Sequence, residues 1–160
     1  MKKKIMLIAG SLFVFASVEA FSFGIGLRGN FGWGIYGGGL LFSTNERTHF
    51  GANYYVGEDS FHLGVTGDFW LLQVPLTSVG SGELDFYAGP GLYVQIDKPK
   101  DDDFDFGLGL RIPVGLDLGF DIFDVFLEFA PQIGVSFLPS PGLSGNWFSA
   151  AIGFRFWIGE

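Results

Sequence analysis

The stretch FGLGLRIPVGLDLGF, residues Phe106 to Phe120, alternates without a break between apolar residues and all others. Every even position holds Phe, Leu, Ile or Val, and every odd position holds Gly, Arg, Pro or Asp. A period of two is typical of a β-strand whose two faces differ chemically. In a soluble protein the apolar face would lie inside, whereas in an outer-membrane barrel it faces lipid. The stretch therefore predicts a strand, and the rest of the sequence must decide which face is outside.

Seven other segments show the same alternation, and together with the first they predict eight strands. They are residues 21–31, 36–42, 49–56, 61–71, 84–96, 125–137 and 147–158. Their second face is mostly glycine with isolated charges, tyrosines and tryptophans, which is typical of a narrow interior and not of a wetted surface. We therefore predict an all-β fold, an eight-stranded antiparallel up-and-down transmembrane β-barrel whose Phe and Leu side chains face lipid.

The predicted interior carries charges of both signs together with aromatic rings. Its basic residues are Arg28, Arg111 and Arg155, and its acidic residues are Asp68, Asp85, Asp117 and Glu128. The aromatic residues on this face are Tyr55, Trp70, Tyr87, Tyr93 and Trp157. Eight strands enclose just enough room for side chains, and an unpaired charge in such a space is costly. We therefore expect arginine–carboxylate pairs that form a charge network and seal the lumen.

Prolines interrupt three consecutive predicted strands, at Pro90, Pro113 and Pro131. Each proline removes a hydrogen bond from the ladder, so we expect bulges there or positions whose missing N–H faces outward. The sequence leaves the strand register around these prolines open. We expect the segment QVPLTSVGSGE, residues 73–83, to connect two strands on the periplasmic side, although turns on that side are usually short.

The beginning of the chain has the features of a secretory signal peptide. Three lysines at positions 2–4 precede an apolar run from Ile5 to Val18, and Ala20 follows. This pattern predicts cleavage after Ala20, so that residues 1–20 are the signal peptide and residues 21–160 the barrel domain. The apolar run is shorter than the roughly 20 residues that a membrane-spanning helix needs. We therefore favour an exported protein over a helical membrane anchor.

Charge and cysteine content exclude several classes of function. Without residues 1–20 the chain keeps six basic and sixteen acidic residues, a formal charge of −10. Nucleic acid is not an expected partner, because neutralising phosphates needs clusters of basic residues. The sequence has no cysteine, which excludes disulfides, thiol nucleophiles and cysteine-based zinc sites.

Four blocks resemble the small outer-membrane β-barrel superfamily of double-membraned bacteria, which includes outer membrane proteins A, W and X, and in particular its uncharacterised members. They are YAGPGLYV (residues 87–94), GLGLRIPVGL (107–116), FLEFAPQIGV (126–135) and GFRFWI (153–158). The resemblance implies a location in the cell outer membrane and assembly by the barrel-assembly machinery, which reads alternating aromatic residues such as Phe154 and Phe156. Family members end on an aromatic residue, whereas this sequence ends in Ile-Gly-Glu.

Three motifs suggest chemistry, and each has a simpler interpretation. GIGLRG, residues 24–29, matches a dinucleotide-binding fingerprint, but no predicted helix follows it. DDDFDFG, residues 101–107, has the spacing of a calcium loop but lacks the required glycine and glutamate. His49 and Asp68 form a candidate acid/base pair if their strands are adjacent, yet no nucleophile motif accompanies them. In that register His62 lies roughly 20 Å from His49, too far to share a metal. We expect no cofactor, no metal and no enzymatic activity.

These observations predict an integral outer-membrane protein with a filled lumen and a structural or surface-interaction role. We expect a monomer embedded in outer-membrane lipid, with DKPKDDD (residues 97–103) and LPSPGLSGN (138–146) available to host or envelope partners. A narrow porin-like channel for small or hydrophobic solutes, which the resemblance to outer membrane protein W implies, is the first alternative. A barrel enzyme acting on lipid or peptide is the second.

Overall fold

The structure, a computed structural model of the chain, describes residues 22–58, 60–99, 104–138, 141–143 and 147–159. These residues form twelve β-strands that pair antiparallel throughout. Within the same ranges there is no helix of the length and apolar character needed to cross a membrane. The predicted signal peptide and most of the two predicted loop regions lie outside the described residues.

The twelve strands follow one another along the chain with short connections. They are β1 (Phe23–Gly32), β2 (Ile35–Asn45), β3 (Thr48–Gly57), β4 (Ser60–Phe69), β5 (Leu72–Val79), β6 (Gly82–Ala88), β7 (Gly91–Pro99), β8 (Asp105–Arg111), β9 (Val114–Gly119), β10 (Phe123–Leu138), β11 (Gly142–Leu143) and β12 (Phe148–Ile158). The prediction of an all-β, antiparallel fold is confirmed.

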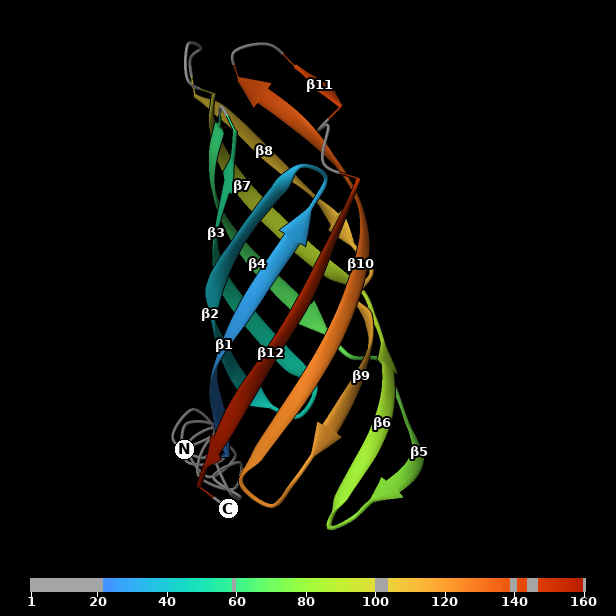
Figure 1. The fold of residues 1–160 in the computed structure, drawn as a ribbon. Helices are drawn as coiled ribbons and strands as arrows, with labels where there is room; N and C mark the ends of the chain where they lie inside the picture. The colour runs from blue at the N-terminus through green and yellow to red at the C-terminus, as the bar shows by residue number, and fades with distance from the viewer. Residues whose placement is uncertain (1–21, 59, 100–103, 139–140, 144–146, 160) are drawn as a thin grey trace, which may run out of the picture.

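Eight of these strands close a ring of hydrogen bonds (Figure 1). The order is β12, β1, β2, β3, β4, β7, β8 and β10, and β10 pairs with β12 to complete the ring. Strands β9, β6 and β5 extend from β10 toward the end of the ring where β1 begins and β12 ends, which we call the termini end. Following Cα partners from Glu83 once around the ring leads to Tyr93, ten residues further along the chain. The strands are therefore staggered as well as paired.

The count of twelve strands differs from the expected eight because three long extended segments are each divided by two residues that are not part of a strand, and because there is one additional short strand. The breaks fall at residues 70–71, 89–90 and 112–113, and β11 adds a short strand beside β10. Across residues 112–113 the register does not change, because β8 and β9 pair with β10 in one continuous alignment. Across residues 70–71 the alignment shifts by one residue between the β4–β7 and β5–β6 pairs.

The three prolines remain in the sheet without the expected bulges at Pro113 and Pro131. The Pro90 carbonyl accepts a hydrogen bond from the Phe69 N–H at 2.9 Å, and the Pro113 carbonyl accepts one from the Gly89 N–H at 3.1 Å. The Pro131 carbonyl accepts one from the Ile112 N–H at 2.9 Å. Each proline thus keeps its acceptor in the ladder and loses only its donor. The alignment of β8 and β9 with β10 continues past Pro113 and Pro131, whereas beside Pro90 the register shifts by one residue, in line with the expected irregularity.

Residues 73–83 were expected to form a connection, and this expectation is wrong. The segment contains most of β5 and the start of β6, which are joined by a tight turn at Gly80. The φ of Gly80 is 63°, and that of Gly34, in the turn between β1 and β2, is 69°. A positive φ favours glycine at both turns. A register irregularity between Pro75 and Thr77 breaks the alternation of β5, which explains why the strand is hard to see in the sequence. Because β5 and β6 are joined by a short turn, residues 73–83 no longer form the long connection that was unusual for the periplasmic side.

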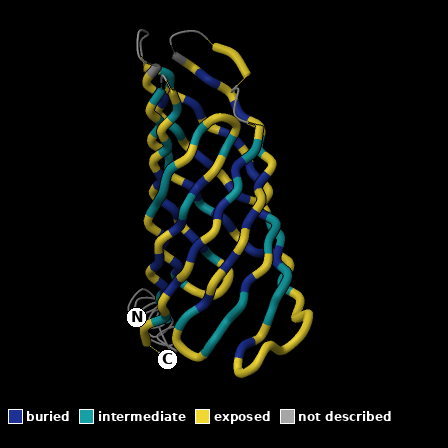
Figure 2. The backbone as a smooth tube through the Cα atoms, viewed as in Figure 1, coloured by how far each residue is buried: buried dark blue, intermediate teal, exposed yellow. Residues whose placement is uncertain are grey.

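The apolar residues of the alternation are exposed on the outside of the ring, as predicted. Buried and exposed residues alternate along the strands (Figure 2). Leu40 is 61% exposed, Leu110 60% and Val65 58%, and they represent a larger set of exposed apolar side chains around the ring. The inward face holds the buried polar and charged residues, including arginines that are 2–5% exposed. The interior of the ring is therefore polar and the outer wall apolar.

Candidate functional site

Two arginines and two carboxylates form a charge layer across the middle of the ring, which we call the Arg111 layer. Arg111 Nη2 lies 2.5 Å from Glu128 Oε1, and Arg111 Nη1 lies 3.4 Å from Asp68 Oδ2. Arg28 Nη1 lies 3.9 Å from the same Glu128 oxygen. These residues come from β8, β10, β4 and β1, and each side chain is at most 6% exposed. The layer therefore balances two positive and two negative charges away from water.

Neutral side chains complete the coordination of Arg28. Its Nε donates to Asn53 Oδ1 at 2.6 Å, and its Nη2 donates to Thr66 Oγ1 at 3.0 Å. A Cβ atom at Gly51 would lie 2.6 Å from Arg28 Nη2. Glycine at this position therefore makes the room that the guanidinium occupies, as the glycine-rich inner face predicted.

Nearer the termini end, Arg155 is the centre of a second charge layer, the Arg155 layer. Its Nε donates to Asp124 at 2.8 Å, and its Nη2 donates to Asp117 Oδ1 at 3.0 Å. Its Nη1 lies 2.6 Å from His49 Nδ1. The Trp157 indole N–H donates to the second oxygen of Asp124 at 2.7 Å. One guanidinium thus joins strands β12, β10, β9 and β3.

Stacked aromatic rings fill the space between the two layers. The rings of Trp70 and Tyr87 are 3.6 Å apart and nearly parallel, and the His49 ring lies 3.9 Å from Trp70. The Arg155 guanidinium lies 4.7 Å from the Trp70 ring centroid, within the range of cation–π attraction. The Tyr87 hydroxyl donates to Glu128 at 3.2 Å and so connects the aromatic rings to the Arg111 layer.

The predicted acid/base pair of His49 and Asp68 does not form, although the two residues are Cα partners on β3 and β4 as expected. His49 Nδ1 lies 2.8 Å from Ser43 Oγ as well as close to Arg155, and its Nε2 lies 3.1 Å from the Glu46 carbonyl. Asp68 pairs with Arg111 instead. Both nitrogens of His49 are therefore engaged, and the ring acts as a link in the Arg155 layer.

The charge network contains most of the predicted residues and one that the sequence analysis missed. Arg28, Arg111, Asp68 and Glu128 meet in one layer, and Arg155 and Asp117 meet in the other. Asp85 is the Cα partner of Asp117, but it accepts a hydrogen bond from the Gln73 side-chain amide at 3.0 Å instead of pairing with an arginine among the described residues. Asp124 was missed because the predicted strand began at Val125. One more residue of alternation would have placed it inward.

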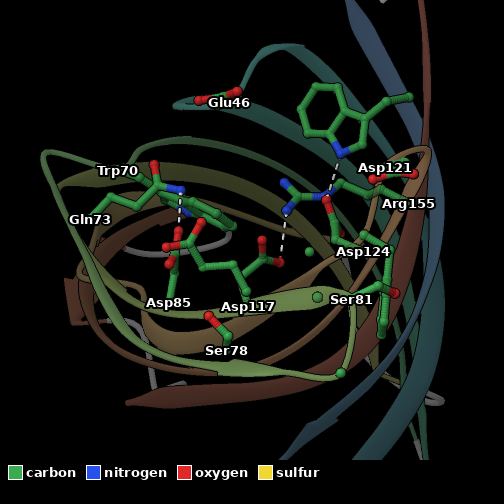
Figure 3. A pocket seen from close by; sticks show the side chains of 16 residues that line it. Glu46, Trp70, Gln73, Ser78, Ser81, Asp85, Asp117, Asp121, Asp124 and Arg155 are labelled. Atoms are coloured by element: carbon green, nitrogen blue, oxygen red, sulfur yellow. Dashed lines mark hydrogen bonds and ion pairs between the residues drawn. The ribbon is translucent and has the colours of Figure 1, made fainter.

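A cavity of about 530 Å³ opens at the termini end below the Arg155 layer (Figure 3). Arg155 and Asp124 lie on one side of it, and Gln73 and Asp85 from the β5–β6 hairpin lie on the other. Its acidic lining residues are Glu46, Glu83, Asp85, Asp117, Asp121 and Asp124. Trp70, which stacks on Tyr87, is buried and also lines the cavity. The cavity is therefore an acidic vestibule that ends at the stacked aromatic rings.

The remaining candidate motifs show no binding geometry in the described part of the chain. The GIGLRG segment lies entirely within β1 and is followed by β2, so it lacks the helix that a pyrophosphate site requires. Asp101 and Asp103 of the calcium-like motif lie outside the described residues. Among the residues that are described, no group of three His, Asp or Glu side chains is arranged to hold a metal ion.

Comparison of the sequence with protein-family models gives no match, and comparison with curated proteins gives none either. Among solved structures, the crystal structure of the N-terminal β-barrel domain of Pseudomonas aeruginosa OprF is similar to this chain, with a TM-score of 0.50. The match covers 87% of this chain and 98% of that one, at 16% sequence identity. At this identity the likeness is one of fold, and it confirms the predicted resemblance at the level of an outer-membrane β-barrel-like architecture.

Proposed function

We propose that the chain is an integral outer-membrane protein, with an eight-stranded transmembrane β-barrel and a structural or surface-interaction role. The apolar outer wall supports this proposal. Large side chains such as Leu40, Leu110 and Ile133 are 56–61% exposed, and they recur around the whole ring. Soluble monomers rarely expose contiguous apolar patches larger than a few hundred Å², whereas lipid is a suitable environment for such a wall.

The stagger of the ring supports the count of eight barrel strands. Because the register does not change across residues 112–113, β8 and β9 are two parts of one long strand. In the same way, β6 continues into β7 without a change of register, and β4 continues into β5 with a shift of one residue. Eight strands with a ten-residue offset enclose an interior just wide enough for side chains. The two charge layers and the aromatic rings fit an interior of this size.

The observation that carries the proposed filled lumen is the Arg111 layer. Its four charged groups come from four strands and are at most 6% exposed. The acidic vestibule of about 530 Å³ lies on one side of the layers, and a cavity of only about 20 Å³ near Tyr55 and Tyr93 lies on the other. A passage for solutes would have to cross both layers. The arrangement therefore favours a closed lumen over a conduit.

Ion conductance in planar bilayers tests this proposal directly. We expect the refolded wild-type protein to show no steady conductance, because the paired charges and the stacked rings leave no continuous water path. A steady, ohmic conductance from folded protein would replace the closed-lumen proposal with the narrow channel for small or hydrophobic solutes.

Further elements of the proposal rest on the sequence. Cleavage after Ala20 would release the chain into the periplasm, from which the barrel-assembly machinery would insert it as a monomer into outer-membrane lipid. The loops at residues 97–103 and 138–146 would then be available to host or envelope partners. Detection of the cleaved chain in the outer-membrane fraction tests the export and the location together.

A further inference from the structure

A second histidine takes part in a hydrogen-bonded chain at the end of the ring opposite the termini end, which we call the far end. His62 Nδ1 lies 2.5 Å from Asp97 Oδ1, and His62 Nε2 lies 2.9 Å from Ser60 Oγ. His62 and Asp97 are Cα partners on β4 and β7, and Ser60 is two residues before His62 on the same face of β4. A hydroxyl, an imidazole and a carboxylate are therefore connected in series.

The carboxylate determines the direction in which protons can move along this chain. An ionised Asp97 only accepts hydrogen bonds, so neutral His62 carries its proton on Nδ1 and leaves Nε2 as the acceptor. Ser60 must then donate its hydroxyl proton to Nε2. Asp97 is itself held by the Gln95 side-chain amide, which donates to its other oxygen at 2.7 Å. This is the arrangement of nucleophile, base and orienting carboxylate that activates a serine.

The environment of His62 differs from that of His49 in two respects that matter for catalysis. His49 is 4% exposed, and its Nδ1 lies 2.6 Å from Arg155 Nη1. The side chain of His62 is 22% exposed and that of Asp97 is 13% exposed. Neither His62 contact is to a cation. His62 and Asp97 are therefore less buried than the side chains of the Arg155 layer, and no guanidinium in the described part of the chain occupies either nitrogen of the His62 ring.

We propose that Ser60, His62 and Asp97 form an acyl-transfer site that hydrolyses carboxylic esters. Ser60 Oγ attacks the ester carbonyl carbon while its proton passes to His62 Nε2. The tetrahedral intermediate collapses, His62 returns the proton to the leaving oxygen, and an alcohol departs from acyl-Ser60. A water molecule, deprotonated in the same way, then attacks the acyl group, and the carboxylic acid leaves as Ser60 regains its proton. Asp97 keeps the imidazole oriented through both steps.

The position of the site limits the substrates that it can take. The three side chains lie on the inner face of a narrow ring, so a substrate must present its carbonyl through the mouth of that ring. Compact esters meet this condition, and folded proteins do not. The inference does not depend on the proposed membrane location, because the hydrogen-bonded chain is a property of the ring itself. It does depart from the expectation of no enzymatic activity, which considered only His49 as a base.

The test uses the refolded full chain in detergent micelles with two probes, a fluorophosphonate and p-nitrophenyl butyrate. Mass spectrometry of the labelled wild-type protein should place the phosphonate on Ser60. Ser60→Ala and His62→Ala should lower kcat for the ester at least about 1,000-fold, and Asp97→Asn between about 100-fold and 10,000-fold. Ser43→Ala is the matched control, because it removes the hydroxyl bonded to the other histidine. We expect it to change kcat less than about twofold.

Each remaining outcome overturns the proposal. Labelling at another residue, turnover that persists in Ser60→Ala, or a folded wild-type protein inert to both probes would each show that the chain of hydrogen bonds is only structural. Migration of the unheated protein on a detergent gel verifies folding for every variant. If Ser60→Ala does not fold, the site of phosphonate labelling in the wild-type protein decides the question without a variant. The closed-lumen proposal is tested separately by conductance, so the two can fail independently.

Discussion

Removing the guanidinium of Arg111 should strongly destabilise the folded protein. Arg111→Met keeps most of the aliphatic stem but leaves Asp68 without its ion pair at 3.4 Å and Glu128 without its contact at 2.5 Å. Glu128 retains Arg28 at 3.9 Å and the Tyr87 hydroxyl at 3.2 Å. The layer changes from electrically balanced to a net charge of −1. Because both carboxylates are only 5% exposed, water cannot easily compensate for the lost charge.

The expected loss in the free energy of unfolding is about 3 to 5 kcal/mol, the usual cost of leaving one member of a buried ion pair without its partner. A second variant isolates the electrostatic cause. Arg111→Met combined with Asp68→Asn restores neutrality, so it should recover about 2 kcal/mol relative to Arg111→Met alone. Leu110→Met is the control, because Leu110 is 60% exposed on the outer wall of the same strand.

Guanidinium unfolding monitored by tryptophan fluorescence, in vesicles or micelles, measures these differences. Trp70 lies in the stacked rings beside the layer, so its emission reports on the relevant region. The reasoning fails if Arg111→Met is within about 0.5 kcal/mol of the wild type, the usual range for a neutral surface change. It also fails if the double variant is no more stable than Arg111→Met, since the cost would then not come from an unpaired charge.

Three further predictions concern the wall, a turn and the folded state. Val65→Arg should lower the free energy of unfolding in vesicles by about 2 to 4 kcal/mol, because it places a charge on the outer wall. Gly64→Ser on the inner face should have a small effect, since the nearest atom to a new Cβ lies 3.4 Å away. Equal effects of the two changes would contradict the assigned faces. Gly80→Val should lower the free energy of unfolding, measured by denaturant titration, by about 1 to 2 kcal/mol, because the φ of Gly80 is 63°. Gly80→Asn should lower it less, since asparagine adopts a positive φ more readily. Unheated protein should migrate on a detergent gel as a compact species distinct from the boiled chain, and identical migration would contradict a closed barrel.

The period of two predicted the faces of the strands because side-chain direction depends only on position along a strand. It could not predict strand pairing near residues 73–83, since Pro75 and the irregularity beside it disrupt the alternation. The alternation also could not predict how close neighbouring backbones lie at each glycine. Gly64 and Gly109 look alike in the sequence, but a Cβ at Gly109 would collide with the Ile133 carbonyl oxygen and lie 2.6 Å from the Tyr93 ring. Of these two glycines, only Gly64 leaves room for a small side chain.

The charge network was predictable as a set and not as individual pairs. Parity placed three arginines and several carboxylates in one interior, and burial required them to meet. The pairing of Asp68 with Arg111 instead of His49 depends on how side chains pack, because Trp70 packs against the His49 ring and Arg155 Nη1 lies 2.6 Å from its Nδ1. The position of Asp85 depends on the β5–β6 hairpin, where Gln73 becomes its partner. Neither feature follows from alternation.

The same hairpin explains why the Ser60, His62 and Asp97 chain was not found in the sequence. The pairing of β4 with β7 is determined by the turn that joins β5 to β6, and that turn falls within the segment first assigned as a connection. From the Val79–Gly82 pair beside that turn, two one-residue shifts, one between Pro75 and Thr77 and one across residues 70–71, bring His62 opposite Asp97. The two histidines therefore have different surroundings. His49 lies in the Arg155 layer beside a guanidinium, and His62 lies at the far end beside a carboxylate. The proposed closed lumen and the proposed ester-hydrolysing site are therefore compatible in one ring, because the two charge layers and the Ser60, His62 and Asp97 chain lie at different levels along the strands.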